Sequence, residues 1–185
     1  MPALALIEAE ARGCVACPLA GTRTQVVFAR GSGRSGLMFV GEAPGKDEDL
    51  QGAPFVGRSG QLLDRLVAEE VGIERDDYYV ANVLKCRPPG NRDPLPDEIA
   101  SCAHFLDAQI AEVAPKVIVT LGNFATRYLL GTTEGITRVR GRVHPYRDGI
   151  VIVPTFHPSA ALRSGGAVIT DMRADLIRAK RALHR

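Results

Sequence analysis

Short apolar runs alternate with longer amphipathic stretches along most of the chain. Four runs are apolar at nearly every position and are predicted to be buried strands: 36–41, 78–84, 116–121 and 150–153. Four further segments have helical spacing or helix start and stop signals: 59–70, 96–113, 123–130 and 171–183. Apolar strands separated by helices are typical of a parallel sheet that is covered on both faces.

In such a sheet, ligands bind at the carboxyl ends of the strands. That rule selects four segments of this chain: 41–55, 82–87, 121–123 and 155–163. These segments also carry the least common side-chain chemistry in the sequence. We therefore expect the functional residues among them.

Length and composition set the broad class. The 185 residues, 45% hydrophobic and 24% charged, predict one globular domain spanning 1–185. No apolar run is long enough to span a membrane, and the first residues lack the pattern of a secretory signal. Cytoplasm is the expected compartment. A net charge of +2 does not by itself indicate a nucleic-acid partner.

Four cysteines form an unusual set for a cytosolic chain, in which disulfides are disfavoured. Cys14 and Cys17 make one C-x2-C pair, and Cys86 and Cys102 follow far along the chain. Four thiolates can hold zinc or a [4Fe–4S] cluster, and buried cysteines unrelated to any metal are the third interpretation. Zinc ribbons usually have two C-x2-C knuckles, so the spacing favours a cluster.

The first strand runs directly into a glycine-rich acidic loop, GEAPGKDED, at 41–49. It matches neither of the common phosphate-binding loops, and its acids would repel phosphate. They would suit a cationic transition state or the orientation of a water molecule; a solvated acidic turn is the alternative. Phe55, just downstream between turn-forming residues, is either a lid over a small core or a stacking platform for a base.

The segment after the fourth strand carries His157 next to Pro158. A histidine held at a strand end can donate a hydrogen bond to developing negative charge, although a lone histidine is more often structural. Leu162 is flanked by Arg163, an arrangement typical of a wedge residue that enters a base stack; the alternative is a helix with Leu162 facing the core. The basic stretch 137–144 alternates cations with small or apolar residues. It predicts either a hairpin strand with a phosphate-binding ridge or a solvated edge strand.

Together these motifs resemble the family 4, or iron–sulfur, uracil-DNA glycosylases. The resemblance rests on GEAPGKDED, PFVGRSGQLLD, YVANVLKCRPPGNRDPLPDEIASC and FHPSAALR, and it covers the chain from the first cysteine to the last helix. It implies a three-layer αβα sandwich with a central four-stranded parallel sheet. It also implies hydrolysis of the N-glycosidic bond of uracil in DNA, without strand cleavage. The implied cofactor is a structural [4Fe–4S] cluster ligated by Cys14, Cys17, Cys86 and Cys102.

The resemblance also implies roles for individual residues. A flipped-out uracil would stack on Phe55, the amide of Asn82 would read its O4 and N3 edge, and His157 would stabilise charge on O2. The Glu42–Gly45 turn, which includes Ala43, would line the pocket. Leu162, or the weaker wedge Ala161, would fill the vacated stack beside two further DNA-contacting residues, Ser159 and Arg163. We expect a monomer that acts on single- or double-stranded uracil-containing DNA.

Two positions depart from the best-known branch of the superfamily. Ala43 stands where that branch has a water-orienting Asp, so we expect Glu42 to orient water or to counter the cationic sugar. Gly45 stands where that branch has an aromatic wall against the thymine methyl, and our hypothesis is that Glu48 supplies the wall. A related branch cross-links DNA through a His after the second strand. Segment 87–93 contains no His, so we predict turnover.

Two other classes of function fit parts of the sequence. One is a DNA-binding module that keeps the cluster and has lost the chemistry. The other is a zinc-stabilised nucleotide-binding protein. The presence of Phe55, Asn82 and His157 together argues against the first.

Overall fold

A computed structural model describes residues 2–184. Its central sheet has the order β2-β1-β3-β5-β4. The strands are β1 (Leu37–Gly41), β2 (Tyr79–Asn82), β3 (Val117–Leu121), β4 (His144–Pro145) and β5 (Val151–Thr155). All neighbouring strands pair in parallel except β4, which pairs antiparallel with β5. The predicted four-stranded parallel sheet is therefore confirmed, with a two-residue antiparallel strand added at one edge.

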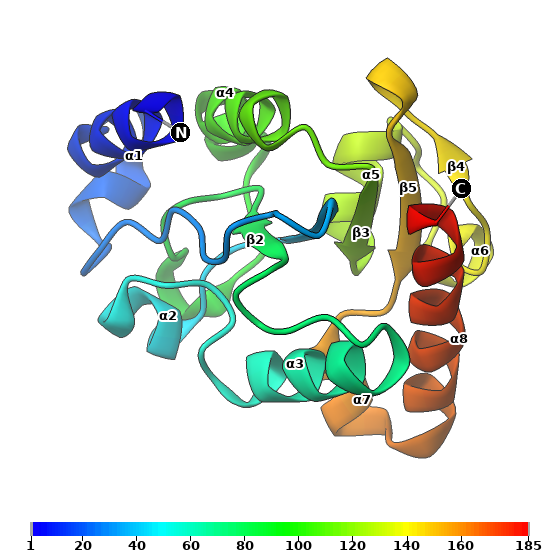
Figure 1. Ribbon diagram of the computed structural model, residues 1–185. Helices are drawn as coiled ribbons and strands as arrows, with labels where there is room; N and C mark the ends of the chain where they lie inside the picture. Colours follow the sequence, from blue (N-terminus) through cyan, green and yellow to red (C-terminus); the bar gives the residue numbers. More distant parts are fainter. Residues whose placement is uncertain (1, 185) are drawn as a thin grey trace.

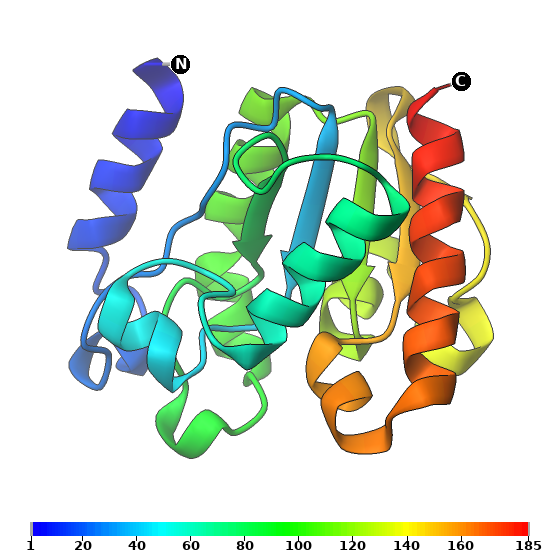
Figure 2. The same ribbon diagram turned by 60° about the horizontal axis from the view of Figure 1, so that its bottom comes forward.

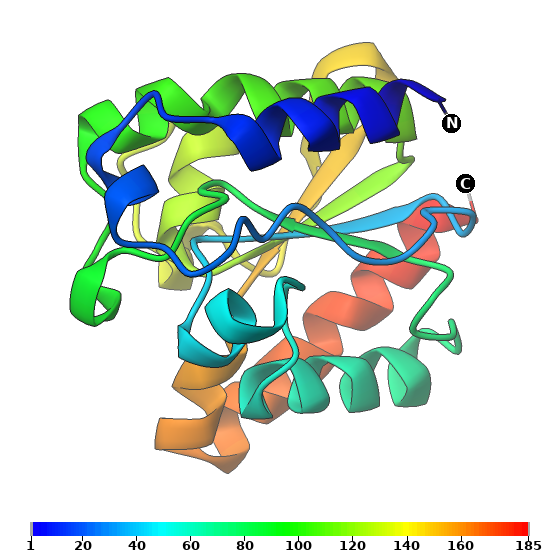
Figure 3. The same ribbon diagram turned by 90° about the vertical axis from the view of Figure 1, so that its left-hand side faces the viewer.

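Helices cover both faces of the sheet, as Figure 3 shows from the side. On one face lie α1 (Pro2–Gly13), α4 (Pro96–Val113) and α5 (Asn123–Leu130). On the other face lie α3 (Arg58–Glu70), α7 (Pro158–Ser164) and α8 (Gly166–Leu183). Short helices α2 (Lys46–Gln51) and α6 (Ile136–Val139) and three 3-10 turns occupy the connections: η1 (Pro18–Gly21), η2 (Pro89–Asn91) and η3 (Arg147–Gly149). This is the αβα sandwich that the sequence predicts.

The strand pattern of the sequence explains the layers. Every residue of β1, β2 and β3 is buried, because helices pack on both sides of these strands. Alternate residues of β1 enter different cores. Leu37 and Phe39 pack with α3 and α8, whereas Met38 and Val40 pack with α4 and α5. A third, smaller core joins α1, η1 and α4 around the cysteines.

The basic stretch 137–144 differs from its prediction. Arg138 lies on the short helix α6, and only His144 and the next residue form a strand. Arg140 points inward: its guanidinium pairs with Asp171 and with the fully buried carboxylate of Asp175 on α8. The predicted hairpin strand with a phosphate-binding ridge is therefore wrong, because this ion pair turns Arg140 away from solvent.

The final helix also differs from its prediction, since it begins at Gly166 rather than at residue 171. In its extra first turn, Val168 and Ile169 pack against the core between the sheet and helices α3 and α8.

The carboxyl ends of the parallel strands meet at one end of the molecule. Figure 2 shows α2, η2 and α7 gathered at that end, whereas α1 begins and α8 ends at the opposite end. The loops that follow β1, β2, β3 and β5 therefore lie together at the edge of the sheet where the sequence predicts the functional residues.

Within residues 2–184, no helix is long and apolar enough to cross a membrane.

Candidate active site

A cleft of about 680 Å³ opens between the loops at the carboxyl ends of the strands. Its walls come from the β1–α2 loop, the end of β2, η2, the β3–α5 turn and the β5–α7 turn. Nearly all residues predicted for catalysis, base binding and DNA binding line it: Glu42, Ala43, Gly45, Glu48, Phe55, Asn82, His157, Ser159 and Arg163. The structure therefore brings together side chains that are more than 100 residues apart in the sequence.

Asn82, the last residue of β2, lies deep in this cleft. Its side chain is 2% exposed, and among the described residues its Oδ1 has no hydrogen-bond partner. A buried polar atom left unpaired destabilises a fold by about 1–3 kcal/mol. Such an atom facing a cleft is suited to a ligand that supplies the missing N–H donor.

The Phe55 ring lies beside Asn82, and its position depends on Gly41, for which the sequence predicts no role of its own. A Cβ atom on Gly41 would lie 2.8 Å from two ring carbons of Phe55 and 2.4 Å from Asn82 Oδ1. Any side chain at this position would push the ring and the amide away. A glycine at the last position of the first strand is the sequence signal for such a close approach.

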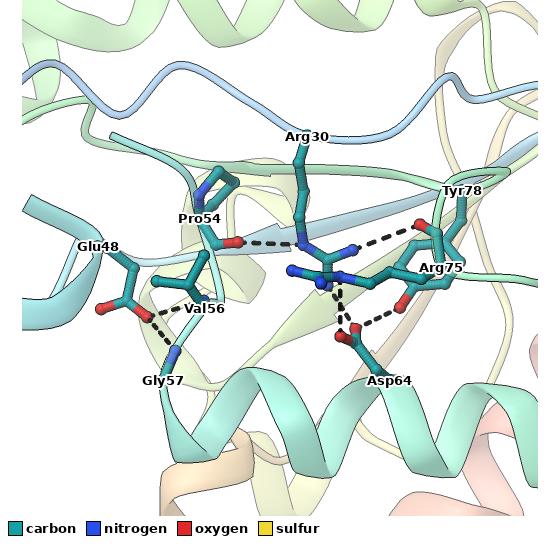
Figure 4. Close-up of polar contacts among 8 residues, drawn as sticks. All are labelled: Arg30, Glu48, Pro54, Val56, Gly57, Asp64, Arg75 and Tyr78. Atoms are coloured by element: carbon teal, nitrogen blue, oxygen red, sulfur yellow. Dashed lines mark hydrogen bonds and ion pairs between the residues drawn. The ribbon is translucent and has the colours of Figure 1, made fainter. Parts of the chain in front are cut away.

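The backbone of Phe55 has a φ of 54°, in the left-handed region. For a residue with a side chain this conformation costs about 1–3 kcal/mol and persists only where the surroundings enforce it. Glu48 supplies part of that enforcement, as Figure 4 shows: its Oε1 accepts the N–H groups of Val56 and Gly57, both at 3.2 Å. Its Oε2 accepts the N–H of Gly45 at 3.1 Å, so one carboxylate ties two walls of the cleft together.

His157 faces Phe55 across the cleft, with ring centroids 5.7 Å apart. Its Nδ1 accepts the backbone N–H of Ser159 at 3.2 Å and lies 2.8 Å from the Ser159 hydroxyl. A backbone N–H can only donate, so the neutral ring carries its proton on Nε2. Burial, with a smaller effect of the Arg163 cation, lowers the pKa of His157 to about 4. Near neutral pH the side chain is therefore a neutral Nε2–H donor.

Glu42 lies on the loop after β1, next to Ala43. Burial, and then repulsion by the Asp93 carboxylate, raise the pKa of Glu42 to about 7. A carboxyl group with such a pKa exchanges its proton near neutral pH, as a general base must. The cleft thus combines an aromatic face, an amide oxygen without a partner in the described part of the chain, a neutral N–H donor and a proton acceptor.

The two wedge candidates on α7 differ in exposure. Ala161 is buried in the core, whereas Leu162 is 42% exposed. Leu162 lies outside the cleft itself, one residue before the cleft-lining Arg163. The alternative in which Leu162 faces the core is therefore wrong, and Leu162 is an exposed apolar tip beside a cation.

The four cysteines line a second, small cavity. They come from the segment after α1, the loop after β2, and α4, and all four thiols are free within the described chain. Arg23 Nη1 donates to the sulfur of Cys86 at 3.4 Å, and the backbone N–H of Lys85 donates to the sulfur of Cys102 at 3.3 Å. Such N–H···S contacts are the kind that stabilise thiolates in metal clusters.

The four thiols line one cavity but do not form a ready metal site. Across residues 2–184, no three Cys, His, Asp or Glu side chains converge on a point that would hold one metal ion. A zinc ion needs thiolates about 2.3 Å from a common centre. Four thiolates are a ligand set that both zinc and a [4Fe–4S] cluster accept.

Comparison with known sequences agrees with this geometry. The family that matches the chain is described as the uracil DNA glycosylase superfamily, and the match covers residues 28–179. The chain belongs to this superfamily. Every residue that lines the cleft falls within the matched range, and the superfamily match therefore includes Glu42, Phe55, Asn82 and His157.

Several curated uracil-DNA glycosylases are similar over most of their length. A Type-4 uracil-DNA glycosylase from Thermotoga maritima is 48% identical over 160 residues, 86% of this chain and 83% of that protein. One from Sulfurisphaera tokodaii is 46% identical over 169 residues, 88% of this chain and 77% of that protein. One from Saccharolobus solfataricus is 44% identical over 169 residues, with 88% and 78% covered. The predicted resemblance to family 4 uracil-DNA glycosylases is confirmed.

Proposed function

We propose that this protein is a monofunctional uracil-DNA glycosylase of base excision repair. It hydrolyses the N-glycosidic bond of uracil in DNA and leaves an abasic site. The observation that carries the proposal is the buried Oδ1 of Asn82, which has no partner within residues 2–184, beside the Phe55 ring and the neutral His157. These three groups match the edge, the face and the leaving-group oxygen of one pyrimidine. The names of the similar proteins support the same reaction.

Uracil enters the cleft after it is flipped out of the DNA stack. Its face stacks on Phe55, its N3–H donates to Asn82 Oδ1, and its O4 accepts from the Asn82 amide nitrogen. Cytosine has an unprotonated N3 and an amino group at position 4, so both hydrogen bonds would be lost. A buried site of this kind discriminates strongly, because the wrong base leaves polar groups unpaired.

The C1′–N1 bond breaks with its electron pair moving onto the base, and the negative charge gathers on uracil O2. His157 donates its Nε2–H to that oxygen; a neutral donor suffices, because the stabilisation comes from a fixed dipole in a dry site. The sugar becomes oxocarbenium-like. A water molecule adds to C1′, and its proton passes to the carboxylate of Glu42, which also counters the cationic charge. Ala43 has no group that could do this.

The ionisation of Glu42 makes a testable prediction about pH. The single-turnover rate of uracil excision should rise as the pH is raised through about 7, because the carboxylate is the active form. Protonation of His157 should lower the rate only near pH 4. Single-turnover rates on a uracil-containing oligonucleotide from about pH 3.5 to about pH 9 measure both effects.

Glu42→Gln provides the control for that profile. The variant should have a lower plateau rate and no inflection near pH 7. Since burial raises the Glu42 pKa above its ordinary value, the native fold should lose stability as the pH rises toward 7, and the variant should lose less. An unchanged inflection in Glu42→Gln would assign the titration to another group.

Glu48 is proposed as the wall that excludes the thymine methyl group. A Cβ atom on Gly45 would lie 2.7 Å from Glu48 Oε2, so the Glu48 carboxylate fills the space beside that glycine. Glu48→Ala should therefore acquire measurable activity on a thymine-containing oligonucleotide. Full rejection of thymine by a folded Glu48→Ala variant would remove this role from Glu48.

Leu162 is proposed to fill the gap that the flipped base leaves, while Arg163 and the first turn of α7 around Ser159 hold the DNA backbone. The exposed Leu162 side chain and the placement of Arg163 on the cleft wall support this arrangement. The partner is thus uracil-containing DNA. Segment 87–93 has no His, and we propose that the enzyme turns over rather than cross-linking to DNA.

We propose that Cys14, Cys17, Cys86 and Cys102 hold a [4Fe–4S] cluster whose contribution is structural, joining the segment after α1 to β2 and α4. Protein purified without oxygen should contain about four irons and four sulfides per chain and absorb visible light broadly. Cys102→Ala should lose iron and melt roughly 5 °C lower or more. Ser101→Ala, a neighbour that lines the same cavity, should keep its iron. Zinc in place of iron in the native protein would contradict the assignment.

A further inference from the structure

The strained backbone of Phe55 is held from both sides by charged side chains. After Phe55, the N–H groups of Val56 and Gly57 donate to Glu48. Before Phe55, the carbonyl of Pro54 accepts a hydrogen bond of 3.1 Å from Arg30 Nε. Figure 4 shows these two clamps on opposite sides of the same short segment. Arg30 belongs to none of the motifs, and its contact with Pro54 spans 24 residues of sequence.

Arg30 is itself fixed in several directions. Its backbone pairs with Val80 of β2 through two hydrogen bonds of 3.0 and 2.9 Å. Its guanidinium bonds to Asp64 of α3, and the hydroxyl of Tyr78 donates to the same carboxylate oxygen. The Arg30 side chain is 10% exposed, and its guanidinium carbon lies 5.2 Å from the centre of the Tyr78 ring. The direction of its Nε–H is therefore set by contacts away from the cleft.

Helix α3 confines the Phe55 backbone from a third direction. A Cβ atom on Gly60, in the first turn of α3, would lie 1.8 Å from the Phe55 carbonyl oxygen. The backbone of α3 thus packs directly against the Phe55 peptide. With Asp64 one helical turn further along α3, the same helix contacts the segment and also orients Arg30.

We propose that Arg30 is a positioning residue for uracil excision. By holding the Pro54 carbonyl, it keeps Phe55 in its left-handed conformation, with the ring set as a platform at the cleft floor before the base arrives. Asp64 orients the guanidinium for this contact. The inference rests on the proposed function, because a platform is needed only if a flipped base stacks there. A pre-set platform matters because small misplacements in a site can lower rates strongly.

The test combines Arg30→Lys with Phe55→Ala in a double-mutant cycle. Lysine keeps the charge beside Asp64 but lacks the Nε–H that reaches Pro54. Single-turnover rates are measured on a uracil-containing oligonucleotide with the holoprotein, alongside melting temperature. Arg34→Lys is the matched control, since Arg34 is 74% exposed and pairs only with Asp77 among the described residues. Asp64→Asn replaces Arg30→Lys if the latter does not fold.

We expect Arg30→Lys to lower the rate about tenfold when Phe55 is present and less than about twofold in the Phe55→Ala background. Arg34→Lys should change neither rate. If Arg30 has a merely structural role, Arg30→Lys should lower the rate by the same factor with Phe55 present and in the Phe55→Ala background. That result would overturn the proposal. So would an Arg30→Lys rate equal to that of the native protein. If the native protein itself excises no uracil, the proposed function fails first and the positioning role fails with it.

Discussion

Replacing His157 by alanine should lower the single-turnover rate of uracil excision about 10²–10³-fold, the usual effect of removing one preorganised donor to a developing oxyanion. The reason is the neutral Nε2–H donor, whose tautomer is fixed by the Ser159 N–H at Nδ1. Affinity for the uracil-containing oligonucleotide should change little, since the charge on O2 develops only as the bond breaks. Rates and binding are measured with the same oligonucleotide.

His104→Ala serves as the control, because His104 lies on α4, is 54% exposed and does not line the cleft. It should retain the native rate. An equal loss of rate in both variants would point to a general effect of removing a histidine. A native rate in His157→Ala with an intact fold would exclude His157 from the reaction.

Replacing Asn82 by alanine should lower excision about 10²–10⁴-fold, the equivalent of two lost hydrogen bonds to the base. The same substitution should leave the free energy of unfolding unchanged or raised. The Asn82 Oδ1 is buried and unpaired within the described residues, so the free protein loses a destabilising group. Excision assays and chemical denaturation of one preparation measure both quantities.

A loss of excision rate without a loss of stability distinguishes a base-binding role of Asn82 from a structural one. Asn123 provides the comparison, because its Oδ1 accepts the N–H of Ile136 at 2.8 Å. Asn123→Ala should therefore lose stability, whereas Asn82→Ala should not. A large loss of stability in Asn82→Ala would mean that Asn82 is a structural residue, and the proposed reading of the uracil edge would need another group.

The positions of the strands and of the cleft follow closely from the sequence. The four main strands are almost wholly apolar, a pattern typical of a parallel sheet with helices on both faces. Once the strands are known, the residues at their carboxyl ends are known too. Asn82 and His157 therefore reach the cleft as predicted, although 75 residues separate them in sequence.

The features that depend on distant partners could not be found in the same way. Arg140 sits in a stretch whose alternation favours an exposed strand, but its partner Asp175 comes 35 residues later. The left-handed conformation of Phe55 is likewise invisible in sequence, because Arg30 and α3 enforce it from elsewhere. The acidic loop does carry a local signal for α2: Glu48, three residues after the N-cap Gly45, accepts the backbone N–H of that glycine.

The layout seen in Figure 2 has a consequence for joining this protein to others. The beginning of α1 and the end of α8 lie at the end of the sheet opposite the cleft. A second domain attached by a short flexible linker at either terminus would therefore leave the approach to the cleft open. Such a tether raises the effective concentration of one domain near the other to the millimolar range. A fused DNA-binding module would thus concentrate the cleft on chosen stretches of DNA while the catalytic groups stay untouched.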